Sequence, residues 1–214
     1  MMDRKIKGEN MDKIINFVKL ELQHDNSGHG LQHALRVYSN AKKINDKEMG
    51  NEKIVLTAAL IHDTVDKKLF ENFDGRIDYV KHFLSNNHYS SEEIDEIIYI
   101  ISNISWNDGK NTELNSLNAK IVRDADRLDA IGAIGIIRTI EYGNSKHRNF
   151  YDNDNIVYNN GKYEFNQITN STLSHFYEKL LLLKDKLHTK TAMGMAEERH
   201  KFMLSFLNEF YNEI

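Results

Sequence analysis

Most of the chain repeats apolar positions at helical spacing, with polar residues between them. One stretch differs, because residues 54–61 are apolar on nearly every side. A helix that is hydrophobic all round belongs in the interior of a protein. His62 and Asp63 follow this stretch directly. The pattern therefore places an imidazole and a carboxylate at the buried end of a core helix.

Amphipathic periodicity predicts further helices on both sides of this core segment. They lie at residues 11–23, 31–44, 77–84, 94–101 and 117–142, and from residue 171 to the end, with a last helix at 195–211. Ser90 and Glu93 form a capping-box pattern in front of the helix at 94–101. Gly132 and Gly135 lie within the stretch at 117–142, where we expect them to let another helix approach closely.

Residues 144–169 interrupt the helical pattern. They include Asn160-Gly161 between two apolar and aromatic arms, which is typical of a β-hairpin. We therefore expect an all-α protein that forms a single domain over residues 1–214, with a small loop or β-hairpin inserted around residues 150–166.

The composition narrows the classes of function. The chain has no proline and 11 glycines, which permits long uninterrupted helices. It also has no cysteine, so any metal must be held by His, Asp or Glu. The net charge of −4 lacks the basic stripe of a nucleic-acid binder. No signal peptide or membrane-spanning run is evident, so we expect a cytoplasmic protein without a nucleic acid or a membrane as partner.

Three carboxylates, those of Asp124, Asp126 and Asp129, fall within six residues of otherwise apolar sequence. With His33 and the His62-Asp63 pair they supply two imidazoles and at least two carboxylates. Mixed nitrogen and oxygen ligands suit an octahedral Mn, Fe, Co, Ni or Mg ion better than a closed structural zinc site. The sequence thus predicts a catalytic divalent metal, and the alternative is a buried His-Asp pair that is only hydrogen-bonded.

Several neighbouring charged residues have a structural interpretation as well. Asp124 and Asp129 are expected to cap or to pair with nearby cations rather than to bind metal. The expected partners are Lys120, Arg123 and Arg127. The alternative to a functional role is a place on the solvated face of an amphipathic helix for four further residues: His175, Lys179, Arg199 and His200.

The order of three short segments resembles a known family. His33, residues 58–63 (Ala-Ala-Leu-Ile-His-Asp) and residues 125–128 (Ala-Asp-Arg-Leu) are similar to the H…HD…D signature of the HD-domain metal-dependent phosphohydrolases. Further likeness to the YpgQ-type group of stand-alone bacterial HD hydrolases lies at residues 29–33, 63–68, 124–135, 175–180 and 196–203. The resemblance covers nearly the whole chain.

The resemblance implies a role for each matching residue. It assigns the divalent metal, with Mn expected first, to four ligands: His33, His62, Asp63 and Asp126. It places Asp66 where many members have an acidic residue that handles the attacking water or the leaving group, although Asp is shorter than the commoner Glu. The cations expected beside Asp66 are Lys67 and Lys68. The residues expected to contact substrate are His29, Lys179 and Arg199.

The resemblance also implies a reaction, the cleavage of nucleoside or deoxynucleoside triphosphates to the monophosphate and pyrophosphate. The same metal core would serve a nucleoside monophosphate phosphatase or a phosphodiesterase. Outside the enzymes, the alternative is a nucleotide sensor without turnover, and the intact Asp66 together with four intact ligands favours the enzyme. The methionine-rich last helix could serve a homodimer.

Overall fold

The computed structural model describes residues 2–23, 30–65, 73–104, 113–152, 156–159, 162–165 and 168–214. The regular structure in these ranges is helical apart from one β-hairpin, so the prediction of an all-α fold with a small hairpin is confirmed. The chain divides into two compact units, residues 1–126 and 127–214. The expectation of a single domain stays a prediction, and the units are described in turn.

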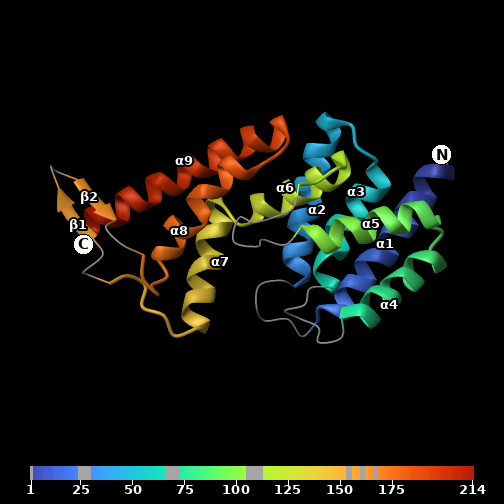
Figure 1. Ribbon diagram of the computed structural model, residues 1–214, viewed down its shortest axis with the longest axis horizontal. Helices are drawn as coiled ribbons and strands as arrows, with labels where there is room; N and C mark the ends of the chain where they lie inside the picture. The colour runs from blue at the N-terminus through green and yellow to red at the C-terminus, as the bar shows by residue number, and fades with distance from the viewer. Residues whose placement is uncertain are drawn as a thin grey trace. The chain divides into compact units, whose positions relative to one another are not determined.

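The helices of the first unit can be followed from blue to green in Figure 1. They are α1 (Met2–Glu21), α2 (Leu31–Glu48), α3 (Glu52–Ile61), the 3-10 helix η1 (His62–Val65), α4 (Phe73–Asn86) and α5 (Ser91–Asn103). Ser90 caps α5 as predicted, because its hydroxyl accepts from the Glu93 N–H while the Glu93 carboxylate accepts from the Ser90 N–H.

Helix α3 forms the centre of the first unit. Every residue from Ile54 to Ile61 is buried, and α1, α2 and α5 pack against it. This position explains why residues 54–61 are apolar on nearly every side, since no face of this segment meets water. The Asn51 side chain caps its start by accepting from the Ile54 N–H at 3.3 Å. At its other end the backbone tightens into η1, so His62 opens a 3-10 turn instead of closing the α-helix.

The predicted helix at 117–142 is two helices, α6 (Leu117–Asp129) and α7 (Gly132–Ser145). The break falls at Ala130 and Ile131, and Gly132 has φ +79°, in the region that favours glycine. A Cβ at Gly132 would lie 3.0 Å from the Cβ of Arg199 on α9 (Lys190–Glu213), so the predicted close approach of another helix is confirmed there. At Gly135 that prediction is wrong, because the nearest atom is the Ala130 carbonyl oxygen of the preceding turn.

The second unit contains the inserted hairpin. Strands β1 (Ile156–Asn159) and β2 (Lys162–Phe165) pair antiparallel, with Ile156 opposite Phe165 and Asn159 opposite Lys162. Asn160 and Gly161, on which the hairpin prediction rests, lie outside the described residues.

Besides α7 and the hairpin, the described part of the second unit contains α8 (Ser174–Glu178), the 3-10 helix η3 (Leu180–Lys186) and α9. The last helix begins at Lys190, earlier than predicted, because the Thr189 hydroxyl caps it by accepting from the Ala192 N–H at 3.3 Å. None of the helices in the described part of the chain has the length together with the apolar character needed to cross a membrane.

Candidate metal centre

Three elements of the first unit bring four of the predicted site residues together. His33 lies in the first turn of α2, and His62 and Asp63 are the first two residues of η1. Asp126 lies in the last turns of α6. Burial of three of these side chains is nearly complete, with exposures of 2%, 4% and 6% for His33, His62 and Asp63.

The donor atoms of the buried three converge on one point. The Nε2 atoms of His33 and His62 are 3.1 Å apart. The two oxygens of Asp63 divide between the rings, with Oδ2 at 3.4 Å from His33 Nε2 and Oδ1 at 3.3 Å from His62 Nε2. Each of the three side chains therefore offers a ligand atom to the same place.

Asp126 completes the group from a more open side. Its Oδ1 is 3.4 Å from His33 Nε2 and 3.8 Å from His62 Nε2. Its side chain is 26% exposed, in contrast to the other three. Of the four side chains, that of Asp126 is therefore the most exposed to solvent.

A backbone contact fixes the tautomer of His62. Its Nδ1 lies 2.9 Å from the carbonyl oxygen of Ala59, and a carbonyl can only accept. Nδ1 therefore carries the hydrogen, and the lone pair of the neutral ring is on Nε2, facing His33 and Asp63. A histidine whose second nitrogen donates to a carbonyl is the usual arrangement of a metal ligand.

The cluster fits a divalent cation in both chemistry and spacing. Two imidazole nitrogens and two carboxylates, without a thiolate, suit a metal of the Mn, Fe, Co, Ni or Mg group. Ligand atoms at right angles around one ion lie about 3.0 Å apart when the bonds are about 2.1 Å long. The distances of 3.1–3.8 Å between the donor atoms approach this spacing.

A second group of contacts positions these elements. Asn40 is buried, and its Nδ2 donates to the Ala125 carbonyl at 3.2 Å, which joins α2 to α6 beside Asp126. The Nε of Arg76 donates to the Thr64 carbonyl at 2.7 Å, directly after Asp63. Neither the role of Asn40 nor that of Arg76 was predicted from the sequence. Asn40 had a detectable signal, since it follows His33 by seven positions and is a polar residue on the apolar face of α2.

The remaining carboxylates of α6 are both buried. Asp124 is fully buried, and Asp129 is 2% exposed. Asp129 Oδ2 pairs with Arg138 Nη1 at 2.7 Å, a partner on α7 that the sequence analysis did not name. The predicted partners were Lys120, Arg123 and Arg127, and of these Arg123 and Arg127 donate to the backbone carbonyls of Asn103 and Lys186.

Two predicted substrate contacts lie in the second unit. Lys179 follows α8, and its N–H donates to the His175 carbonyl at 3.1 Å. Burial, together with the positive charges of Lys179 and Arg148, lowers the pKa of His175 to about 4. Arg199 on α9 donates from Nη1 to the Leu128 carbonyl at the end of α6. Burial lowers the pKa of Arg199, and the nearby Asp129 carboxylate acts in the opposite direction.

Four further predicted site residues cannot be placed in this way. His29, Asp66, Lys67 and Lys68 lie outside the described residues. The structure therefore brings together the four predicted metal ligands, and the catalytic residues expected beside them stay predictions.

A known family model and the sequence of a known protein both match this chain. The family model described as the HD domain matches residues 30–131, which include His33, His62, Asp63 and Asp126. The protein YpgQ of Bacillus subtilis (strain 168) is 37% identical over 205 residues, and the match covers 95% of this chain and 93% of that protein.

Solved structures agree with the sequence comparison. The crystal structure of Bacillus subtilis YpgQ in complex with ADP matches with a TM-score of 0.77 and 34% identity, covering 95% of this chain and 97% of that one. An HD-superfamily hydrolase from Bacillus thuringiensis matches with a TM-score of 0.79 and 39% identity, covering 97% of both chains. These similarities extend well beyond residues 30–131.

Proposed function

The chain belongs to the HD-domain family of metal-dependent phosphohydrolases, and from this premise we propose that it cleaves nucleoside and deoxynucleoside triphosphates to the monophosphate and pyrophosphate. The observation that carries the proposal is the convergence of His33, His62, Asp63 and Asp126 on one point. HD domains bind divalent metals, and this donor set suits such an ion.

The proposed metal is Mn, held by these four side chains. A bound divalent metal polarises a phosphoryl oxygen and lowers the pKa of a coordinated water. His62 presents Nε2 because Ala59 holds its other nitrogen. His33 and Asp63 are nearly buried whereas the Asp126 side chain is 26% exposed, so we infer that a substrate approaches the metal beside Asp126.

The remaining chemistry is assigned to the residues that the family resemblance implies. Asp66 takes or returns the proton of the attacking water or of the leaving group. Lys67 and Lys68 offset the charge that develops on the phosphates, since phosphoryl transfer depends mainly on positioning and charge neutralisation. Substrate contacts by His29 and Lys179 complete the proposal.

The nucleotide part of the proposal is supported by a relative. The structure of Bacillus subtilis YpgQ holds ADP, which has a base, a sugar and a phosphate chain. This chain aligns with that structure over 95% of its length. A nucleotide with a phosphate chain is therefore the class of substrate that we propose, with hydrolysis between the α and β phosphates.

Phosphorus NMR tests the proposal directly. The full chain with Mn would be incubated with a mixed pool of ribo- and deoxyribonucleoside triphosphates, and in a parallel tube with monophosphates. Pyrophosphate and monophosphate appearing together is the expected result. Orthophosphate released in the monophosphate tube would make the protein a nucleotidase, and silence in both tubes, with metal shown to be bound, would favour a phosphodiesterase or a sensor.

A further inference from the structure

The last turn of α6 is held by three arginine side chains. Arg199 donates from Nη1 to the Leu128 carbonyl, and Arg138 pairs with the Asp129 carboxylate at 2.7 Å. Arg127 donates in turn to the Lys186 carbonyl on η3. These contacts anchor three consecutive residues, 127–129, to α9, α7 and η3. Such a concentration of charged donors on one helical turn indicates that its position matters.

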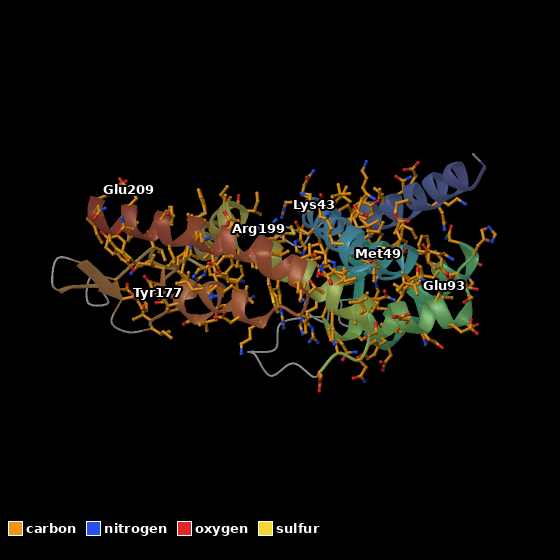
Figure 2. All side chains as sticks on the ribbon, turned by 90° about the horizontal axis from the view of Figure 1, so that it is seen from above. Lys43, Met49, Glu93, Tyr177, Arg199 and Glu209 are labelled. Atoms are coloured by element: carbon orange, nitrogen blue, oxygen red, sulfur yellow. The ribbon has the colours of Figure 1, made fainter. Side chains whose placement is uncertain are left out.

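Arg199 is built into this arrangement. It lies near the middle of α9 (Figure 2). The stem of its side chain occupies the space that a Cβ at Gly132 would need, since such an atom would lie 3.0 Å from its Cβ and Cγ. The negative charge of Asp129 favours the positively charged form of the Arg199 guanidinium. The Leu128 carbonyl also accepts from the Ile131 N–H at 3.3 Å, so Arg199 adds a second, charged donor to this carbonyl at the end of α6.

The turn held by Arg199 directly follows Asp126 in the same helix. Packing around Asp126 is weaker than around the other proposed ligands, because its side chain is 26% exposed whereas theirs are 6% or less. The backbone of α6 therefore contributes more to its position than to theirs. That backbone is anchored on both sides of Asp126, by Asn40 at the Ala125 carbonyl and by Arg199 at the Leu128 carbonyl.

We propose that Arg199 is a positioning residue for Asp126, holding the end of α6 so that this carboxylate meets His33 and His62. The proposal rests on the metal centre of the proposed function. It differs from the substrate contact that the family resemblance implies for Arg199, and it makes a different prediction. A positioning residue governs metal affinity, whereas a substrate contact governs KM.

Mn binding by the full chain separates the two roles. The variants are Arg199→Ala and Arg199→Lys, and the matched control is Lys201→Ala, an exposed cation on the same helix. Isothermal titration gives the Kd for Mn, and steady-state kinetics at saturating Mn give KM for a nucleoside triphosphate. We expect Arg199→Ala to weaken Mn binding about 10- to 100-fold, as loss of a group that orients a metal ligand does. KM should change little, and Lys201→Ala should match the unmodified chain.

A second variant tests whether Arg199 acts on Mn affinity through Asp126. In an Asp126→Asn background, Arg199→Ala should weaken Mn binding by less than it does in the unmodified chain, because the carboxylate that it positions is gone. Arg199→Lys keeps the stem and one donor, so it should lie between the unmodified chain and Arg199→Ala. It also decides the matter if Arg199→Ala does not fold.

Two results overturn the proposal. One is unchanged Mn affinity in Arg199→Ala and Arg199→Lys with a KM raised about tenfold, the result of a lost substrate contact. The other is an equal loss of affinity from Arg199→Ala in both backgrounds. Failure of the proposed function gives a different result from failure of the positioning role. An unmodified chain that binds Mn but releases no pyrophosphate refutes the proposed substrate, and the Mn affinities of the variants can still be compared.

Discussion

The Nε2 atoms of His33 and His62 lie 3.1 Å apart, although the two residues are 29 positions apart in the sequence. His62 directs the lone pair of its Nε2 toward His33, because its Nδ1 donates to Ala59. The Asp63 carboxylate spans the two rings. A positive charge at this point would satisfy all three side chains at once, which is why the cluster is best understood as a metal centre.

Removal of one ligand should abolish the site. We expect His62→Ala and Asp126→Ala each to weaken Mn binding by more than about 100-fold, beyond the loss caused by removing an outer partner of a ligand, and to abolish hydrolysis. Helix content measured by circular dichroism should persist. Titration of Mn into each variant checks this, with His82→Ala, an exposed histidine on α4, as the control. Full activity in either ligand variant would refute the site.

Metal removal should lower stability as well as activity. A cation that binds only the folded chain stabilises it by about 2.7 kcal/mol when the free metal is a hundred times its Kd. For a chain of this size that corresponds to a rise in Tm of about 5–10 °C. Thermal unfolding in EDTA and in excess Mn measures the difference. A shift of the same size in His62→Ala would mean that Mn binds elsewhere.

Asp66 should act after the metal is bound. We expect Asp66→Asn to keep the Mn affinity of the unmodified chain and to lose about 100-fold or more in kcat, because the amide cannot take the proton that a carboxylate takes. Titration of Mn and single-turnover kinetics measure the two effects separately. A variant with an unchanged rate would remove Asp66 from the mechanism.

The sequence predicted the centre of the first unit well because the signals were local. An all-round apolar segment fits only a buried helix, and α3 is buried from Ile54 to Ile61. The two histidines and two aspartates could be grouped because their types and order match a known signature. Their convergence follows from how α2, η1 and α6 pack, and no local pattern fixes that packing.

Features that depend on residues far apart in the sequence were not predicted. The apolar periodicity runs through Ala130 and Ile131, so nothing nearby marked the break between α6 and α7. Arg199 on α9 needs the space that a Cβ at Gly132 would occupy, and that approach is visible only in three dimensions. The pairing of Asp129 with Arg138 was missed for the same reason, since nearer cations along the chain were more obvious partners.

Asn40 should support the metal centre without touching the metal. Asn40→Ala removes the hydrogen bond to the Ala125 carbonyl and leaves a buried gap, so we expect a loss of about 1–3 kcal/mol in the free energy of unfolding. Mn affinity should fall less than it does when a ligand is removed. Urea unfolding in EDTA and Mn titration measure the two effects. Asn86→Ala, an exposed asparagine bonded to His82, is the matched control and should change neither.

The second unit should lose stability as the pH falls below 6.5, the ordinary pKa of a histidine. Burial, Lys179 and Arg148 lower the pKa of His175 to about 4, from 6.5 in the unfolded chain. Glu178 Oε2, 3.7 Å from Nδ1, would favour the charged ring but does not offset these effects. Between pH 6.5 and about 4 the unfolded chain binds a proton at this site that the folded chain does not. Protonation therefore favours unfolding in this window, and stability rises with pH.

His175→Gln removes this titration and should flatten the dependence. We expect the unmodified chain to lose stability more steeply than the variant from pH 6.5 to 4.5, and the two to run parallel above pH 7, where the ring is neutral in both states. Urea unfolding at several pH values, in EDTA so that metal release does not contribute, measures the free energy of unfolding. His82→Gln on the exposed face of α4 serves as the control. Identical slopes for the unmodified chain and His175→Gln would show that His175 titrates normally in the folded state.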